Sequence, residues 1–179
     1  GEMGYGLPGA IGAAFACPNK PIICLNCDGG MMINLQELQT IVNYKLSIKI
    51  IVFNNDGYLM IKHTQKMLFK GNYVGVNEKT GLGLPNYQKL SEGFGIKYMK
   101  YNKDIDINEF LTLEGSAIME VFMDPEQDFS PKVKGVLNQD NTIFSPPLEE
   151  MSPLLPLEKI KEVMSFGFNK KSSYIYRDL

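Results

Sequence analysis

Two short polar stretches have the residue types to hold a metal ion together with a phosphate group. Asp28-Gly29-Gly30 lies between the apolar run 21–25 and an amphipathic segment that begins near residue 34. Asn54-Asn55 follows the β-branched run 48–53, and Asn55 comes 27 residues after Asp28. Carboxylate and amide oxygens are ligands that Mg²⁺ accepts, and a strand–turn–helix directs backbone N–H groups at a phosphate. We expect the two stretches to meet at the carboxyl ends of neighbouring parallel strands.

The elements that must position these stretches alternate along the chain. Apolar and β-branched runs predict strands at 21–25, 48–53, 96–101 and 116–123. Helical spacing of apolar residues predicts helices at 7–16, 34–46, 58–69, 86–95 and 107–113. This alternation predicts an α/β fold, a three-layer α/β/α sandwich with a mainly parallel sheet. Gly9 and Gly12 are about one helical turn apart, so we expect the first helix to lie close against the sheet or a ligand.

The composition changes near residue 124. We predict a core domain over residues 1–124 and a Pro-rich C-terminal tail over residues 125–179, with a short helix at 158–166. The polar, Gly-containing loop 70–85 is longer than most connections, which indicates a functional or mobile segment.

Length and charge exclude several classes of protein. The chain has 179 residues, 44% of them hydrophobic, and a formal net charge of −2, which favours neither nucleic acid nor an anionic membrane as a partner. No apolar run approaches the roughly 18–20 residues that cross a membrane. Three cysteines, an odd number, indicate a reducing compartment, so we expect a cytoplasmic protein. Residue 1 begins inside a motif, so we expect an upstream part to be missing.

Both polar stretches also resemble a known family. Asp28-Gly29-Gly30 through Asn54-Asn55 is similar to the thiamine-diphosphate fingerprint, written Gly-Asp-Gly, an interval in the twenties, then Asn-Asn. The opening 1–13, GEMGYGLPGAIGA, resembles a segment of acetolactate-synthase-like enzymes. Cys27 stands where the fingerprint usually has its first Gly. The resemblance identifies the chain as a C-terminal, diphosphate-binding domain with the thiamine-diphosphate-binding fold.

The resemblance implies two cofactors, thiamine diphosphate and Mg²⁺. It assigns the ion to the Asp28 carboxylate, the Asn55 amide oxygen and the Gly57 carbonyl. It assigns the rest of the cofactor to the following residues: Gly1 and Met3 at the pyrimidine, Gly29 and Gly30 at the phosphates, and Tyr58 and Leu59 beside them. The Met3 side chain would hold the cofactor in its bent form.

The resemblance assigns no catalytic residue to this chain. The activating glutamate of the family belongs to a separate pyrimidine-binding domain, usually that of a partner subunit, and Glu2 lies on the wrong side of the motif for that task. The implied enzyme is a homodimer or homotetramer that decarboxylates a 2-keto acid and transfers or releases the resulting group. We therefore expect this piece to be inactive alone.

Other functions remain open from the sequence. Residues 146–155 resemble a tail found in members encoded with surface-sugar pathways, which favours a sugar-like or cyclic diketone substrate; a plain surface tail is the alternative. A non-catalytic phosphate-binding module is a further candidate. A Rossmann dinucleotide site would need Gly-x-Gly-x-x-Gly after the first strand, and residues 26–32 lack it.

The soft ligands are few. Cys24 and Cys27 form a C-x-x-C pair, a pattern of zinc or redox sites. Cys17 and His63 are the only further soft ligands, so we expect no four-ligand zinc site. His63, on the helix predicted after Asn55, is either a substrate contact or a solvent-facing side chain.

Overall fold

The chain divides into two compact units. The computed structural model describes residues 2–137 and 142–175. Unit 1 comprises Gly1–Gln127 and unit 2 comprises Asp128–Leu179. The sequence places the change three residues earlier, after residue 124, where prolines and charged residues become frequent.

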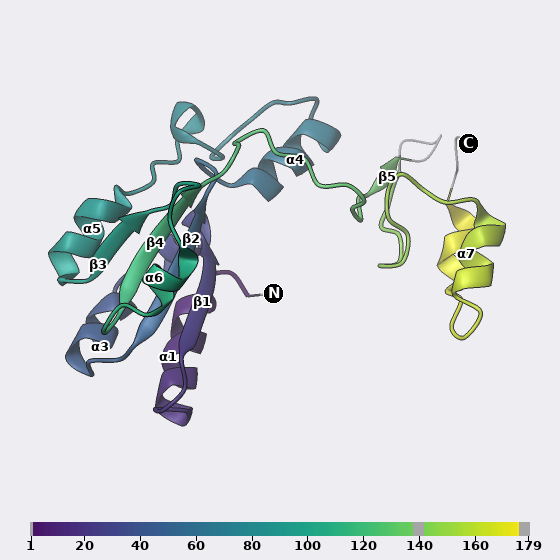
Figure 1. Cartoon of the computed structure of the whole chain (residues 1–179). Helices are drawn as coiled ribbons and strands as arrows, with labels where there is room; N and C mark the ends of the chain where they lie inside the picture. Colours follow the sequence, from purple (N-terminus) through teal and green to yellow (C-terminus); the bar gives the residue numbers. More distant parts are fainter. Residues whose placement is uncertain (1, 138–141, 176–179) are drawn as a thin grey trace. The chain divides into compact units, whose positions relative to one another are not determined.

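Unit 1 is built on a four-stranded parallel sheet (Figure 1). Its strands, in spatial order, are β1 (Ile22–Cys27), β2 (Ile48–Asn54), β4 (Ala117–Phe122) and β3 (Lys97–Lys100). β1 and β2 are adjacent and in parallel register, with Cys27 opposite Phe53. The predicted α/β class and the predicted adjacency of the two strands are therefore confirmed.

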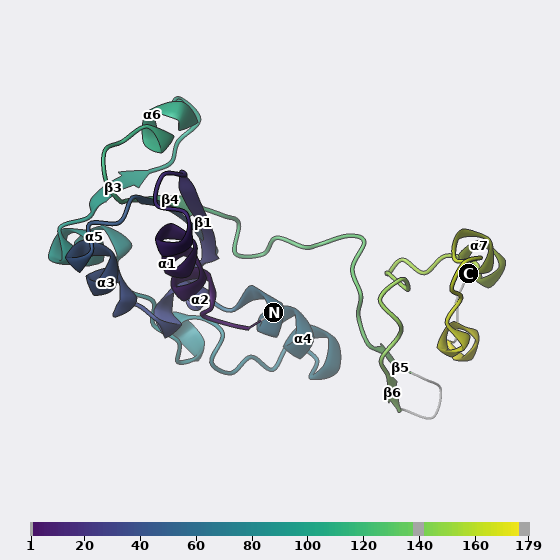
Figure 2. The same ribbon diagram turned by 90° about the horizontal axis from the view of Figure 1, so that it is seen from below.

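The helices cover the two faces of this sheet unequally. They are α1 (Gly6–Ala16), α2 (Asp28–Ile33), α3 (Glu37–Asn43), α4 (Leu59–Leu68), α5 (Tyr87–Phe94) and α6 (Ile107–Leu111). Figure 2 shows α1, α3 and α5 on one side of the sheet and α6 on the other. The larger apolar core lies on the α1 side and includes Leu7, Leu38 and Ile50. A smaller core around Phe110, Ala117 and Met119 lies under α6.

The direction of each crossover explains this distribution. The chain moves across the sheet in one direction from β1 to β2 and on to β3, and it returns from β3 to β4. Because crossovers between parallel strands are right-handed, the returning helix lies on the opposite face. α6 is that helix, so the second helical layer of the sandwich consists of one short helix.

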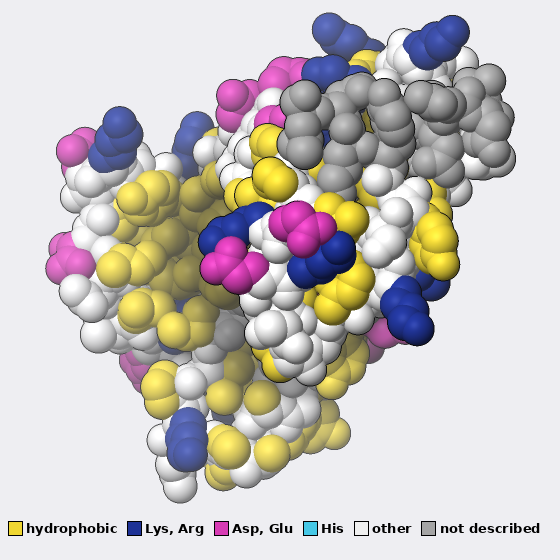
Figure 3. Space-filling model, turned by 90° about the vertical axis from the view of Figure 1, so that its right-hand side faces the viewer, with side chains coloured by type: hydrophobic (Ala, Val, Ile, Leu, Met, Phe, Trp, Pro, Cys, Tyr) yellow, Lys and Arg dark blue, Asp and Glu magenta, His cyan; other side chains and the backbone are white. Residues whose placement is uncertain are grey.

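β1 forms an edge of the sheet and has an uncovered face. Ile23 and Leu25 point to this face and are 50% and 63% exposed, whereas Cys24 between them is buried. Figure 3 shows hydrophobic side chains gathered at the surface in its view of the molecule. β1 is thus buried against α1 on one face only.

The glycines of α1 do not have the predicted role. α1 packs on the sheet through Leu7, Ala10, Ile11 and Ala14. A Cβ placed on Gly12 would meet no atom within 4 Å, and one placed on Gly9 would meet the Tyr5 ring at 2.9 Å. Gly9 and Gly12 therefore do not bring the helix close to the sheet, because they lie away from the packed face, and their predicted approach to a ligand stays a prediction.

Unit 2 is small and has its own secondary structure. β5 (Val136–Leu137) and β6 (Ile143–Phe144) pair in antiparallel fashion, followed by α7 (Leu157–Val163) and the 3₁₀ helix Lys170–Tyr174. Glu150, inside the segment 146–155, is fully buried, while Leu148 is 81% exposed. This segment therefore contributes to the interior of unit 2 as well as to its surface. Across both units, none of the described helices has the length and hydrophobicity that a membrane crossing requires.

Candidate cofactor site

The fingerprint begins a helix directly, without an intervening turn. β1 ends at Cys27, and Asp28 is the first residue of α2. The predicted tight turn at 28–30, with its helix beginning near residue 34, is therefore wrong. Gly29, Gly30 and Met31 are buried, so tertiary packing holds a helix that two glycines disfavour. Asp28 in the first turn also complements the positive end of the helix dipole.

The Asp28 carboxylate joins the ends of the two strands. Its Oδ2 accepts hydrogen bonds from the backbone N–H groups of Asn55, at 2.9 Å, and Gly57, at 3.2 Å. Its Oδ1 accepts from the N–H of Gly29 at 2.6 Å. An ionised carboxylate offers about four lone-pair positions, so about one remains for a further ligand. The two predicted stretches therefore come together at this group.

Burial strongly affects the charge of Asp28, which is 1% exposed. Burial raises the pKa of its carboxyl above the ordinary value, and the three backbone hydrogen bonds offset this only in part. The nearby Asp56 raises that pKa further. A cation bound next to the group would favour the charged form and lower the pKa. A cation bound here would therefore offset the effect of burial on the Asp28 carboxyl.

Asn55 adds a second oxygen that fits such an ion. Its Oδ1 is buried and has no hydrogen-bond partner within the part of the chain that the structure describes. A buried polar atom left unpaired costs about 1–3 kcal/mol, so an unpaired oxygen beside a carboxylate suits metal coordination. Carboxylate and amide oxygens are hard ligands that match Mg²⁺ better than zinc.

Two glycines allow the loops to pack closely around Asp28. A Cβ on Gly29 would lie 1.9 Å from a ring carbon of Tyr58, so this ring lies directly over the start of α2. Gly57 has φ +144°, and its Cβ would lie 2.0 Å from the carbonyl oxygen of Val76. That same oxygen accepts a hydrogen bond from the Tyr58 N–H at 2.9 Å. The N–H groups of Gly29, Gly57 and Tyr58 thus all have acceptors within the protein.

The opening segment is attached to the other end of α2. Gly1 lies outside the described residues, and the Met3 side chain is 59% exposed. The Gly4 carbonyl accepts a hydrogen bond from Asn34 Nδ2 at 2.8 Å, just after α2 ends. A Cβ on Gly4 would approach Ile33 to 2.6 Å, so only glycine permits this contact. Met3 and Asp28 are therefore associated with opposite ends of one short helix.

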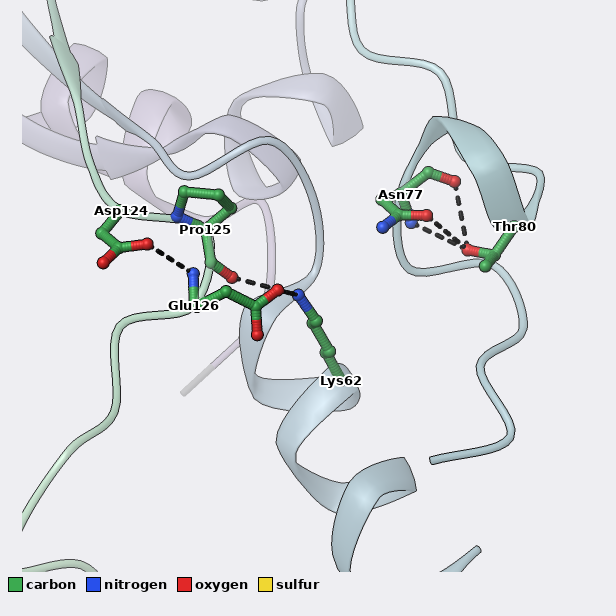
Figure 4. Close-up of polar contacts among 6 residues, drawn as sticks. All are labelled: Lys62, Asn77, Thr80, Asp124, Pro125 and Glu126. Atoms are coloured by element: carbon green, nitrogen blue, oxygen red, sulfur yellow. Dashed lines mark hydrogen bonds and ion pairs between the residues drawn. The ribbon is translucent and has the colours of Figure 1, made fainter. Parts of the chain in front are cut away.

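A cavity of about 230 Å³ borders the Asn55–Gly57 loop. It is lined by Asn55, Asp56, Gly57, Leu59, Lys62, Val76, Asn77, Glu78, Lys79, Pro125 and Glu126. Figure 4 shows Lys62 reaching from α4 toward Pro125 and Glu126, where it donates to the Pro125 carbonyl at 3.2 Å and forms an ion pair with Glu126. On the facing wall, Thr80 donates to Asn77 Oδ1 at 3.0 Å and closes a 3₁₀ turn over Glu78–Thr80. Leu59 is buried at the start of α4, and His63 on the same helix is half-buried.

The C-x-x-C pair does not converge. Cys24 is buried and donates to the Gly6 carbonyl at 3.4 Å, and burial raises the pKa of its thiol to about 11. Cys27 is exposed, because residues three apart in a strand point to opposite faces. All three cysteines are free thiols, and the described residues contain no group of three or more His, Cys, Asp and Glu side chains placed to hold a metal.

Cys27→Gly is expected to change the affinity for Mg²⁺ and thiamine diphosphate only modestly. Cys27 has φ −105° and ψ 163°, an extended conformation open to any residue, and its side chain is exposed. Titration calorimetry on wild type and variant checks this, and native alkylation of the thiols should leave binding intact. Bound zinc lost on alkylation, or a reversible Cys24–Cys27 disulfide linked to binding, would contradict it.

This arrangement matches a described protein family. The family model "Thiamine pyrophosphate enzyme, C-terminal TPP binding domain" matches residues 1–139. The chain belongs to this family. Thiamine pyrophosphate is another name for thiamine diphosphate, so the predicted family and its cofactor are confirmed.

Curated relatives place this thiamine-diphosphate domain in the acetolactate-synthase-like group. The chain is 36% identical over 137 residues to "Acetolactate synthase large subunit" of Porphyra purpurea, covering 74% of this chain and 23% of the relative. It is also 36% identical over 137 residues to "Acetolactate synthase isozyme 1 large subunit" of Escherichia coli (strain K12), covering 74% and 24%. The chain therefore spans about a quarter of the length of these relatives.

Solved structures show the same fold. Benzoylformate decarboxylase from Polynucleobacter necessarius matches with a TM-score of 0.61 at 23% identity, over 70% of this chain and 24% of that one. The 4-hydroxybenzoylformate decarboxylase of Rhodococcus jostii RHA1, which is thiamine diphosphate-dependent, matches with a TM-score of 0.60 at 27% identity, over the same shares. The predicted thiamine-diphosphate-binding fold is confirmed.

The structure adds buried polar residues that sequence reasoning missed. The Tyr87 hydroxyl donates to the Asp28 backbone carbonyl at 2.6 Å and anchors the start of α2. Glu120 lies at the centre of the sheet, 4% exposed. An acidic residue within the apolar strand 117–122 was the available signal, since buried carboxylates are rare unless they have partners.

Proposed function

We propose that this domain supplies the diphosphate- and Mg²⁺-binding half of an active site in an acetolactate-synthase-like transferase or lyase that acts on a 2-keto acid. The observation that supports this most directly is the buried, unpaired Asn55 Oδ1 beside the Asp28 carboxylate, at the carboxyl ends of β1 and β2. The relatives bear the name acetolactate synthase, and the family model that matches this chain is that of a thiamine-pyrophosphate-binding domain.

The ion would be held by the Asp28 carboxylate, the Asn55 amide oxygen and the Gly57 carbonyl. The Gly29 N–H already donates to Asp28. Phosphate oxygens would therefore compete with Asp28 for this donor or accept from the neighbouring Gly30 N–H. Tyr58 and Leu59 would border the phosphates, and Gly1 and Met3 would meet the pyrimidine. When bound, thiamine diphosphate supplies the carbanion chemistry, and the domain binds, orients and shields it.

The remaining half of the site would come from a pyrimidine-binding domain that carries the activating glutamate. We expect that domain to belong to a partner subunit, in a cytoplasmic homodimer or homotetramer. A second candidate function is action on a sugar-like or cyclic diketone substrate. Residues 146–155, which lie beyond the family match at 1–139, favour it because they resemble the tail of members encoded with surface-sugar pathways.

The isolated 179-residue chain is expected to bind Mg²⁺ with diphosphate yet to lack activity. General acid–base assistance is typically worth about 10²–10⁴-fold, so pyruvate decarboxylation and exchange of the cofactor C2 proton should be slower by at least that factor than in a polypeptide that includes the pyrimidine-binding domain. Kinetics and proton exchange by NMR measure both. Equal rates would mean that the catalytic groups lie in this chain, and no binding of magnesium diphosphate would reject the proposed site itself.

A further inference from the structure

Glu120 is a buried carboxylate that the cofactor site as described does not use. It lies on β4 opposite Val52 of β2 and Lys100 of β3, and it is 4% exposed. Its Oε1 accepts a hydrogen bond from Asn54 Nδ2 at 2.6 Å, and its Oε2 accepts one from the Tyr98 hydroxyl at 2.5 Å. No cation pairs with Glu120 among the described residues, and both side chains that donate to it, Asn54 and Tyr98, are neutral donors.

These hydrogen bonds continue to the loop that holds Asn55 and Gly57. Asn54 is the last residue of β2, and its Oδ1 accepts from the Asp56 N–H at 2.9 Å. Its backbone carbonyl accepts from the Met123 N–H at 2.7 Å. The Asn54 side chain therefore links Glu120 on one side to the backbone of the loop on the other. Without Glu120, only the bond from the Asp56 N–H would orient this amide group.

Loop geometry determines where the predicted ligands lie. Asp56 has a positive φ of 63°, and the residues beside it, Asn55 and Gly57, both donate to the Asp28 carboxylate. The bond to the Asp56 N–H stabilises this backbone conformation, from which the Asn55 side chain extends.

We propose that Glu120 is a positioning residue for the metal site and acts through the Asn54 side chain on the Asn55–Gly57 loop. The inference rests on the proposed function, since it assumes that this loop binds an ion. Tyr98 has a different role, because it holds the far oxygen of Glu120 and, among the described residues, makes no hydrogen bond to the loop. The two partners of one carboxylate therefore provide matched test positions.

Four variants of the 179-residue chain test this: Glu120→Met, Glu120→Gln, Asn54→Ala and Tyr98→Phe. The probe is Mn²⁺ with inorganic diphosphate, and the measurement is the Mn²⁺ dissociation constant by water-proton relaxation. Loss of a hydrogen-bonding partner behind a metal ligand typically costs about 10–100-fold in metal affinity. We expect about a tenfold loss in Glu120→Met and in Asn54→Ala, and no further loss when the two are combined, because both break one path. Glu120→Gln can still accept from Asn54 and should bind almost as tightly as wild type.

Tyr98→Phe separates positioning from general destabilisation. It removes a buried hydrogen bond to Glu120 but leaves the path to the loop, so it should lower the midpoint of urea unfolding and leave Mn²⁺ affinity nearly unchanged. A loss of affinity equal to that of Glu120→Met would overturn the proposal. So would wild-type affinity in Glu120→Met.

A metal-free readout distinguishes this inference from the proposed function. Amide hydrogen exchange of Asp56 should be faster in Glu120→Met and in Asn54→Ala than in wild type or Tyr98→Phe. If wild type binds no Mn²⁺ diphosphate but these exchange rates change as expected, the proposed function fails and the positioning of the loop stands. Unchanged exchange in both variants would reject the role of Glu120. If Glu120→Met does not fold, Asn54→Ala and Tyr98→Phe decide the question.

Discussion

Asp28→Asn is expected to weaken Mg²⁺-dependent binding of diphosphate by at least 100-fold. The change removes the buried negative charge next to the unpaired Asn55 oxygen. It also places an amide N–H₂ among three backbone N–H donors, of Gly29, Asn55 and Gly57. Changes behind the ligands of a metal already cost about 10–100-fold in affinity, so loss of a ligating carboxylate should cost at least that much. Calorimetric titration of Mg²⁺ in the presence of inorganic diphosphate measures the effect.

Asp56→Asn is the matched control. Asp56 lies on the same loop, is exposed, and has a φ of 63°, which Asn tolerates. The control removes the same charge from the same neighbourhood, so it should change the affinity far less. If Asp28→Asn and Asp56→Asn weaken binding equally, the effect is one of net charge and Asp28 is not a ligand.

Gly57→Ala is expected to lower the free energy of unfolding by more than an alanine substitution at any glycine of unit 1 where an added Cβ would meet no atom within 4 Å. A residue with φ +144° is strained for any side chain, at a cost of about 1–3 kcal/mol. In addition, the new Cβ would lie 2.0 Å from the Val76 carbonyl oxygen, so the backbone of one loop must move. That movement would also break the hydrogen bond from Tyr58 to Val76 and displace a predicted metal ligand. Urea unfolding and Mn²⁺ titration measure both effects.

Gly75→Ala separates the clash from the conformational strain. Gly75 also has a positive φ, of 63°, but a Cβ there would meet no atom within 4 Å. Gly75→Ala should therefore lower the free energy of unfolding only by the cost of the left-handed conformation, about 1–2 kcal/mol. Equal destabilisation of the two variants would show that the approach of Val76 to Gly57 is not tight.

Local sequence patterns were sufficient where an element is determined by its own residues. The run 48–53 predicts β2 because β-branched residues fill a strand that neighbours cover, and the Asn86 and Gly95 positions delimit α5. The meeting of Asp28 with Asn55 followed from a topological rule, since parallel strands have their carboxyl ends on one edge. Features that one segment or one rule determines could thus be predicted.

Features that depend on partners far away in the sequence could not be predicted in this way. α2 begins at Asp28, where the ring of Tyr58, thirty residues later, packs over Gly29, and no local pattern in Asp-Gly-Gly indicates a helix. The uneven covering of the sheet follows from the return of the chain between β3 and β4, which requires the strand order. The link from Tyr98 through Glu120 to Asn54 joins three strands, so its partners could not be matched from spacing along the chain.

The burial of Asp28 makes the stability of the folded domain dependent on the supply of its ligands. Burial raises the pKa of Asp28 above its value in the unfolded chain. The stability that the protonated group contributes at low pH is therefore lost as the pH rises through the folded-state pKa. A ligand that binds only the folded state restores stability by mass action, by about 2.7 kcal/mol at a concentration one hundred times its dissociation constant. In a cell with continuous proteolysis of unfolded chains, the steady-state amount of this domain would follow the availability of magnesium and diphosphate cofactor.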